Sequence, residues 1–352
     1  MWSVVGARPQ FVKASIVDAA FQEAAIAHEI VHTGQHFDEN MSDVFFGELR
    51  LPMPRFNLAI RSDRHGDMTG RMLAGLEELM IDHRPAGVIV YGDTNTTLAA
   101  ALAAAKLHIP VAHVEAGMRS GNRMPEEINR IVTDRVSDIL FTASAVATHN
   151  LEREGVSRNR IHEVGDVMYD CALRNAGPAR DRSDVMQRLG VAEHGFVLCT
   201  LHRAENTDDV HRLRCLLDAL ALVHEVIPVV MPMHPRTRAK ASQAGLEIAS
   251  AVHVIEPVGY LDMVRLEMAA AVIATDSGGV QREAFFHRRP CVTLRDETEW
   301  PELIDLGWNV LAPASSPRLV AQTILGRIGL EGIDAAPYGD GNAGKRIARI
   351  LA

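Results

Sequence analysis

The sequence predicts an α/β protein built from two Rossmann-like domains that face each other across a cleft, and three observations support this prediction. The chain has 352 residues, which is long for one compact core. Short apolar runs typical of buried parallel strands alternate with amphipathic helical stretches. After about residue 166 the alternation starts again. A second sheet is the simplest interpretation.

Five strands are predicted in the first half of the chain, with helices between them. The strands are residues 3–5, 29–33, 87–91, 111–115 and 139–142, and the clearest helices are residues 69–81, 96–107 and 126–137. The first residues lack the basic segment and the long apolar segment of a signal peptide. They are therefore predicted to form the first strand.

Five further strands are predicted in the second half, at residues 196–201, 229–233, 252–255, 271–275 and 292–294. Gly, Pro, Asp and Arg accumulate between residues 165 and 182. We expect the domain boundary there, with a first domain at 1–166 and a second at 167–338.

Composition excludes several classes of protein. The formal net charge of −9 argues against a nucleic-acid partner, which needs a basic face. No segment approaches the roughly 18 to 20 apolar residues that span a bilayer. The cysteines are scattered and form no CxxC pair, which favours a reducing cytoplasm over a secreted framework or a zinc ribbon. They are Cys171, Cys199, Cys215 and Cys291.

A tight turn with two basic residues follows the first predicted strand. Pro9 suits the first turn of a helix, and Arg8 lies beside that helix N-terminus, with Lys13 about one turn further on. These are candidate phosphate contacts. The alternative is an ordinary turn with solvated basic side chains.

Carboxylates follow two strands that we expect to be neighbours. Asp93 follows the strand at 87–91, and Glu115 closes the strand at 111–115. Such residues share one crevice, where acid–base chemistry is easily assembled. Alternatively, Asp93 only caps the next helix, and Glu126 is a stabilising acid in a first helical turn.

In the second half, ionisable groups again follow predicted strands. His202 and His234 stand at two strand ends with arginines nearby, which predicts a basic wall toward the acids of the first domain. Ser277, Gly278 and Gly279 precede a helix and form the best candidate diphosphate cradle. Glu283, one turn later, could bind a ribose diol. The alternative is a sharp turn followed by a solvated Glu283.

No metal site is predicted. His32 and His36 have a spacing of four residues, but the glycine between them indicates a strand end and loop rather than one helix face.

Eight short motifs occur in order along nearly the whole chain. They are GARP at 6–9, GDT at 92–94, HVEAG at 113–117, PEEINR at 125–130, LHR at 201–203, DSGG at 276–279, RDETE at 295–299 and PYGDG at 337–341. Together they resemble the non-hydrolysing UDP-N-acetylglucosamine 2-epimerase family.

The resemblance implies the glycosyltransferase B fold, with a final helix at 339–352 that packs back on the first domain. It implies Asp93, Glu115 and Glu126 as catalytic acids and His202 as an essential histidine. Arg8, Ser277, Gly278 and Glu283 match positions that hold diphosphate and ribose. Lys13, Arg130, His234 and Gly279 are further candidate contacts to the UDP-sugar.

The family uses neither a nicotinamide cofactor nor a metal, so none is expected. Many members are dimers, and a homodimer without nucleic-acid or membrane partners is expected here. Its place would be cell-surface polysaccharide biosynthesis in the cytoplasm. The implied reaction eliminates UDP, leaves 2-acetamidoglucal and adds UDP back with inversion at C2. Which carboxylate is the base stays open.

The expected substrate is UDP-N-acetylglucosamine, converted to UDP-N-acetylmannosamine. Gln10 and Trp300 depart from the common family pattern and resemble a branch that epimerises UDP-2,3-diacetamido-2,3-dideoxyglucuronate, the alternative substrate. A glycosyltransferase on the same fold is the alternative of another class. Gln35 and His36 resemble a pair through which some members are activated allosterically by substrate.

Overall fold

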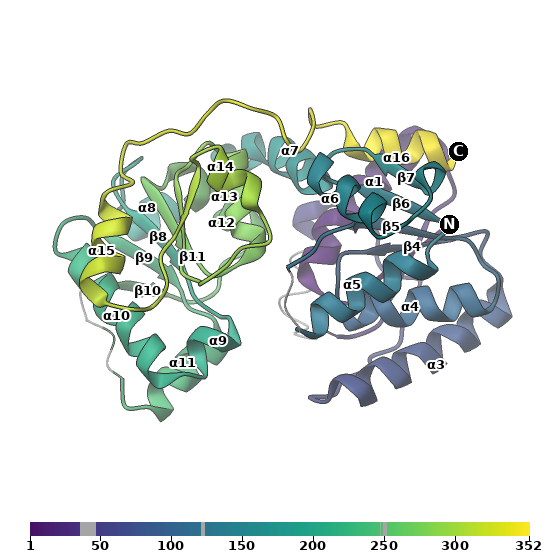
Figure 1. The fold of residues 1–352 in the computed structure, drawn as a ribbon, viewed down its shortest axis with the longest axis horizontal. Helices are drawn as coiled ribbons and strands as arrows, with labels where there is room; N and C mark the ends of the chain where they lie inside the picture. The colour runs from purple at the N-terminus through teal and green to yellow at the C-terminus, as the bar shows by residue number, and fades with distance from the viewer. Residues whose placement is uncertain (36–46, 121–123, 247, 249–251) are drawn as a thin grey trace. The chain divides into compact units, whose positions relative to one another are not determined.

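The computed structural model describes residues 1–352 except 36–46, 121–123, 247 and 249–251. It divides into two compact units, one of Met1–Cys171 with Ala336–Ala352 and the other of Ala172–Ala335. Each unit contains a parallel sheet with helices on both faces (Figure 1). The predicted α/β class with two Rossmann-like domains is therefore confirmed. The domain boundaries at 166/167 and 338/339 stay predictions.

The first sheet runs in the order β3-β2-β1-β4-β5-β6-β7 in the described part of the chain, and its paired strands are parallel. The order reverses between β1 and β4, and ligands of open α/β sheets bind at such a switch point. The bounds are β1 Trp2–Val5, β2 Glu29–His32, β3 Phe56–Asn57, β4 Val88–Tyr91, β5 Val111–Ala116, β6 Ile139–Thr142 and β7 Ile161–Glu163.

Helices cover both faces of this sheet. On one face, Met72, Leu76 and Met80 of α3 point at the strands with i, i+4 spacing, together with the alanine-rich side of α4. On the other face, α1 packs on β1 and carries α16 on its outer side (Figure 1). The bounds are α1 Arg8–Glu23, α3 His65–His83, α4 Asn95–Lys106, α5 Pro125–Val136, α6 Ala145–Arg153, a 3₁₀ turn Arg158–Arg160, α7 Val167–Arg182 and α16 Ala343–Leu351.

The second sheet has the order β10-β9-β8-β11-β12-β13, again with parallel pairing, and its switch point lies between β8 and β11. The bounds are β8 Val197–Thr200, β9 Val229–Pro232, β10 His253–Ile255, β11 Val272–Thr275, β12 Cys291–Thr293 and β13 Asn309–Leu311. The two units thus repeat one topology without obvious sequence repetition.

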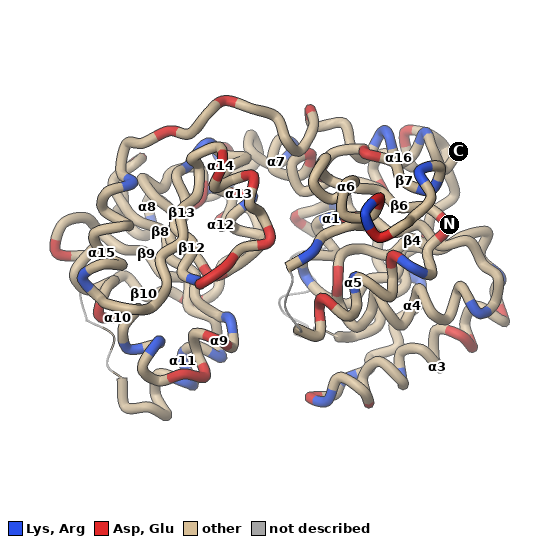
Figure 2. Tube along the Cα trace, viewed as in Figure 1, with Lys and Arg blue, Asp and Glu red and all other residues tan. Residues whose placement is uncertain are grey.

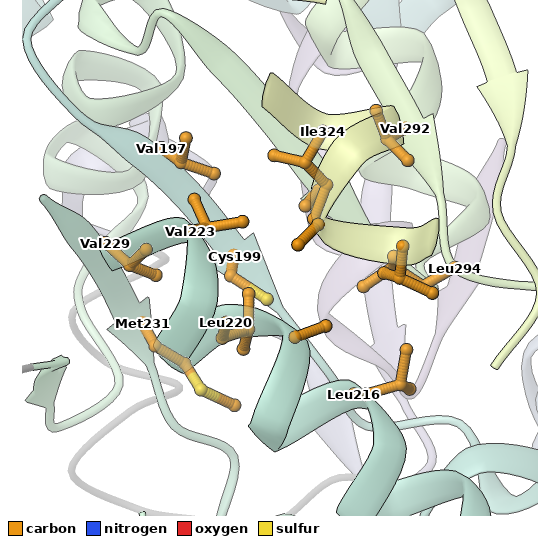
Figure 3. Packing of buried hydrophobic residues seen from close by; sticks show 14 of the residues in the cluster. Val197, Cys199, Leu216, Leu220, Val223, Val229, Met231, Val292, Leu294 and Ile324 are labelled. Carbon is orange, nitrogen blue, oxygen red and sulfur yellow. The ribbon is translucent and has the colours of Figure 1, made fainter. Parts of the chain in front are cut away.

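The core of the second unit lies between its sheet and the helices α10 and α15. Leu216, Leu220 and Val223 of α10 meet Ile324 of α15 and the inward side chains of the strands (Figure 3). Helices α8, α12 and α13 pack on the other face. The bounds are α8 Val185–Leu189, α9 Ala204–Thr207, α10 Val210–His224, α11 Pro235–Gln243, α12 Tyr260–Ala269, α13 Gly278–Phe286, α14 Pro301–Asp305 and α15 Pro317–Leu325.

Most of residues 165–182, whose composition predicted a boundary, form helix α7, which runs from Val167 to Arg182 despite Pro178 inside it. Val167, Cys171 and Ala179 are buried and recur with helical spacing, so apolar periodicity outweighs the Gly, Pro and Asp content. Strands β3, β7 and β13 were missed, because two or three residues at a sheet edge carry too little pattern to recognise. Across the described residues, no helix is both long and apolar enough to cross a membrane.

Candidate active site

Gln10 joins the two strand ends at the switch point of the first sheet. Its Oε1 accepts from the backbone N–H of Gly6 at 2.8 Å and of Ala7 at 3.0 Å. Its Nε2 donates to the Tyr91 carbonyl and the Thr97 hydroxyl, both at 3.0 Å. The sequence connected Gln10 with substrate choice, whereas its buried amide here holds β1, β4 and α4 together.

Arg8 and Lys13, the predicted phosphate contacts of this edge, both lie on α1. Arg8 is the first residue of the helix and is half-buried. Lys13 is buried, and its Nζ lies 2.8 Å from Glu115 Oε1 at the end of β5. Gly92 makes room for this ion pair, because a Cβ there would lie 3.1 Å from Lys13 Nζ and 3.5 Å from Glu115 Oε1.

Glu115 occupies a β-bulge. The pairing register of β5 with β6 shifts between Val114 and Ala116, and Glu115 has a φ of +71°. This left-handed conformation is uncommon for a residue with a Cβ and is found at functional sites more often than elsewhere. Because of the bulge, Glu115 departs from the regular alternation of side chains between the two faces of the sheet.

Asp93 follows β4 and is available for a role other than capping. The N-cap of α4 is Thr94, whose side chain accepts from the Thr97 N–H, so the capping alternative for Asp93 is wrong. The Asp93 carboxylate is ion-paired with Arg130 of α5, and Arg130 also lies 3.0 Å from Glu127. The structure thus brings Asp93 and Arg130 together.

Glu126 is the second residue of α5 and is half-buried. Among the described residues, its Oε2 is buried and has no hydrogen-bond partner. The adjacent Glu127 instead accepts from the backbone and the hydroxyl of Ser120, at 3.1 and 3.0 Å. A buried carboxylate oxygen without a partner needs a donor from elsewhere, which a ligand can supply.

In the second unit, Asp276 follows β11 and binds the segment that follows β8, at the switch point of the sheet. Its fully buried carboxylate accepts from the N–H groups of His202 at 3.1 Å and Arg203 at 3.0 Å, and from Asn206 at 3.2 Å. Burial alone would raise the pKa of Asp276, but these hydrogen bonds and the His202 charge lower it. Asp276 thereby fixes His202, whose side chain is 39 % exposed. Sequence reasoning assigned no role to Asp276.

The predicted diphosphate cradle forms the start of α13. Ser277 is the N-cap, and Gly278 and Gly279 are the first helical residues, so the glycines lie in a helix rather than in a left-handed turn. A Cβ on Gly278 would lie 3.6 Å from Glu299 and 3.7 Å from Arg203 Nη2 and Trp300 Nε1. Glycine therefore keeps the space in front of this helix N-terminus accessible.

Glu283 lies further along α13, close to a second carboxyl group. Glu267 of α12 is fully buried, and burial, followed by the charge and hydrogen bond of Glu283, raises its pKa well above the ordinary value. No pattern in the sequence pointed to Glu267, because it lies inside a helix rather than just after a strand.

His234 caps α11, where its Nδ1 accepts from the Arg236 N–H at 3.2 Å, and its ring centroid lies 6.0 Å from that of His202. The basic residues that follow are paired with acids. Arg236 and Lys240 both contact Asp208, at 2.6 and 2.9 Å. Figure 2 shows the two signs of charge side by side around α9 and α11. The predicted basic wall is therefore largely neutralised within the unit.

Trp300 is buried at the start of α14, and the guanidinium of Arg282 lies over its ring at 4.0 Å. Its indole Nε1 would lie 3.7 Å from a Cβ on Gly278, so the Trp300 ring is close to the N-terminus of α13. Arg295 is fully buried and is paired with Glu205 at 2.8 Å and Glu299 at 2.9 Å. Glu299 in turn would lie 3.6 Å from a Cβ on Gly278.

The remaining predicted residues lie on the first unit. Gln35 accepts from the N–H and hydroxyl of Thr96, at 3.2 and 3.0 Å, whereas His36 lies outside the described residues. His32 is buried and stacks on Phe11 with ring centroids 5.3 Å apart. No group of three or more potential metal ligands occurs in the part of the chain that the structure describes.

Comparisons with known proteins show which family and fold the chain is similar to. The family model described as UDP-N-acetylglucosamine 2-epimerase matches residues 19–352. UDP-2,3-diacetamido-2,3-dideoxy-D-glucuronate 2-epimerase of Pseudomonas aeruginosa is 51 % identical, over 99 % of this chain and 98 % of that protein. UDP-N-acetylglucosamine 2-epimerase of Methanocaldococcus jannaschii is 41 % identical, over 99 % and 97 %. A crystal structure of the M. jannaschii enzyme with UDP-GlcNAc and UDP has a TM-score of 0.93, covering 99 % of this chain and 98 % of that one.

Proposed function

The chain belongs to the UDP-N-acetylglucosamine 2-epimerase family, and from this premise we propose how its residues invert the C2 centre of a UDP-linked 2-acetamido sugar. The protein is an isomerase of the epimerase type. The proposal is carried by the position of Glu115, which lies in a bulge at the carboxyl end of β5 with its Oε1 2.8 Å from Lys13 Nζ. Lys13 stabilises the ionised form of Glu115, and that form can remove a proton.

The C2 proton has no neighbouring carbonyl group, so its direct removal would be very costly. We propose that the bond between C1 and the diphosphate oxygen breaks first or concurrently, with the electron pair leaving on UDP. A carboxylate takes the C2 proton, the C1–C2 double bond forms, and the 2-acetamido glycal of the substrate sugar remains beside UDP; for UDP-N-acetylglucosamine this glycal is 2-acetamidoglucal. UDP then adds back to C1 while a proton reaches C2 from the opposite face.

This reaction needs acids on both faces of the ring, and Asp93, Glu115 and Glu126 are the proposed catalytic acids. Glu115 is the proposed base, supported by its place in the bulge and by the Lys13 Nζ 2.8 Å from its carboxylate. Glu126 is a proposed partner on the other face, supported by its unpartnered buried oxygen among the described residues. Asp93 is held by Arg130, which we propose to position it beside the sugar.

The second unit is the proposed site of the nucleotide. His202, held by Asp276, stabilises the charge that develops on the leaving diphosphate. Ser277, Gly278 and Gly279 bind the phosphates through the α13 N-terminus, and Glu283 binds the ribose hydroxyls. Arg8 and His234 are further proposed contacts to UDP.

Two UDP-sugars are candidate substrates, and the comparisons support both. The 51 % identity to the Pseudomonas protein, against 41 % to the M. jannaschii one, favours UDP-2,3-diacetamido-2,3-dideoxyglucuronate. We therefore propose this uronate as the substrate, with UDP-N-acetylglucosamine as the second candidate. We further propose a cytoplasmic homodimer that serves cell-surface polysaccharide biosynthesis. The four free cysteines support a reducing compartment, and a sedimentation mass of two chains would support the dimer.

The reaction is tested by turnover in D₂O without added NAD or metal. Deuterium should enter C2, because the mechanism breaks the C2–H bond and returns a solvent proton. Glu115→Gln should lower the rate of labelling by at least about a hundredfold, whereas Glu78→Gln on the exposed side of α3 should not change it. Product NMR also separates an epimerase from a glycosyltransferase. Hydrogen retained at C2 through turnover would contradict the mechanism.

Substrate choice is tested by comparing kcat/KM for the two UDP-sugars with the same enzyme preparation. A preference for the diacetamido uronate by more than about tenfold, equal to about 1.4 kcal/mol of transition-state binding, is the expected result. A kcat/KM for UDP-N-acetylglucosamine that equals or exceeds the value for the diacetamido uronate would overturn the choice of substrate and leave the epimerase reaction standing.

A further inference from the structure

Asp134 of α5 lies under the bulge that carries Glu115, and it contacts the chain on both sides of that residue. Its Oδ1 lies 2.7 Å from Nδ1 of His113, two residues before Glu115. Its Oδ2 accepts from the N–H of Gly117, two residues after Glu115, at 3.2 Å. Asp134 is only 2 % exposed, so these contacts are shielded from water.

The same carboxylate is linked to the segment that carries Asp93. Nε2 of His113 lies 2.8 Å from the carbonyl oxygen of Gly92, the residue before Asp93. A carbonyl only accepts, and the Asp134 carboxylate is paired with Arg119 at 2.9 Å, so both nitrogens of His113 face acceptors.

Arg119 links Asp134 to a second carboxylate, that of Glu154. It donates to both oxygens of Glu154, at 2.7 and 2.8 Å, as well as contacting Asp134. Burial would lower the pKa of Arg119, but Glu154 and Asp134 raise it. The buried Asp134 carboxylate is therefore paired with the Arg119 guanidinium and also contacts the His113 ring.

We infer that Asp134 is a positioning residue that holds the backbone on both sides of Glu115 and thereby aims the Glu115 carboxylate at the substrate. The inference rests on the proposed function. It concerns the left-handed conformation of Glu115, which persists only where its surroundings fix it. Because Asp134 and Glu126 belong to the same helix, the contact also sets the distance between two proposed catalytic acids.

Two substitutions separate position from charge. In Asp134→Asn, the amide oxygen can accept from Gly117 and Arg119 while the amide nitrogen faces His113 Nδ1, so the hydrogen-bonding geometry can be retained. In Asp134→Ala every one of these contacts is lost. The matched control is Asp138→Ala, because Asp138 also accepts from the backbone of β5, at 2.8 Å, but at the opposite end of the strand.

We expect kcat for C2 epimerisation to fall at least about thirtyfold in Asp134→Ala, since a displacement near 1 Å of a reacting group can cost about a hundredfold in rate. KM should change by less than about threefold, and Asp134→Asn should recover most of kcat. Asp138→Ala should keep the wild-type kcat. A kcat in Asp134→Ala within about threefold of wild type, or an Asp134→Asn variant as slow as Asp134→Ala, would overturn the inference.

Hydrogen exchange tests the same inference without any turnover. Amides of residues 113–119 should lose protection in Asp134→Ala and keep it in Asp134→Asn, because only the alanine variant releases the bulge. Unchanged protection in the alanine variant would overturn the positioning role. Failure of the proposed function is recognised separately, by the absence of C2 labelling in the wild-type enzyme.

Discussion

His287 illustrates how a single buried residue makes stability depend on pH. Burial, followed by the charges of Arg289 and Arg180, lowers the pKa of His287 to about 4 from its ordinary value of 6.5. Its Nε2 lies 3.8 Å from Glu267, whose pKa is raised. At pH 7 the His287 imidazole is therefore uncharged, so its approach to Glu267 is not an ion pair.

The sign of the effect follows from proton binding. Between about pH 6.5 and 4 the unfolded chain binds a proton at His287 and the folded chain does not, so folding stability falls as the pH falls through this window. His287→Gln should remove up to about 3 kcal/mol of this dependence. Urea unfolding of both proteins at pH 7, 6 and 5 measures it. Parallel stability curves would show that His287 is accessible to protons in the folded state.

Helix α16 shows how the end of the chain is held on the first unit. It packs on α1 where a Cβ on Gly344 would lie 2.7 Å from the Ile16 side chain and 3.1 Å from its carbonyl oxygen. The Gly344 N–H also donates to Asp170 Oδ2 at 2.9 Å. Glycine is therefore required at this helix crossing for its small size.

Two glycine-to-alanine substitutions in helices should have opposite effects. Gly344→Ala should lower the free energy of unfolding by about 1 to 3 kcal/mol, because the added methyl group overpacks the contact with Ile16. Gly70→Ala in α3, where a Cβ meets nothing within 4 Å, should raise it by about 0.5 to 1 kcal/mol through helix propensity. Equilibrium unfolding in urea compares them. A stabilising Gly344→Ala would mean that α1 and α16 can separate at little cost.

For the whole molecule, the division into two units predicts where UDP acts. With UDP alone, amide exchange should slow around residues 200–206 and 275–283 of the second unit, which carry the proposed phosphate and ribose contacts. The acid-bearing segments 92–95 and 113–119 of the first unit should keep their exchange rates until a sugar is attached. Hydrogen exchange read by mass spectrometry distinguishes the two units. Equal protection of both by UDP would contradict the assignment of the nucleotide to the second unit.

The sequence by itself determined the α/β class, the longer strands of both sheets and the helices predicted at residues 69–81, 96–107 and 126–137, because apolar periodicity is a local property of the chain. It also placed His202 and Asp93 after strands, since parallel strands bring their carboxyl ends to one edge. Edge strands such as β3 were missed for lack of pattern. Gly92 and Glu115 both have a left-handed backbone conformation. A glycine can signal such a conformation in a sequence, but a glutamate does not, so the conformation of Glu115 could not be predicted.

Only the tertiary structure decided which of these residues meet. Lys13 and Glu115 are 102 positions apart, and their ion pair depends on β1 and β5 flanking β4, a strand order that no local pattern contains. The hydrogen bonds of Asp276 with His202 and of Asp134 with Gly117 likewise join segments that are separated in the sequence. Buried charges must find partners or hydrogen bonds, and in this fold the partners come from distant segments, because long-range packing rather than sequence spacing brings them within a few ångströms.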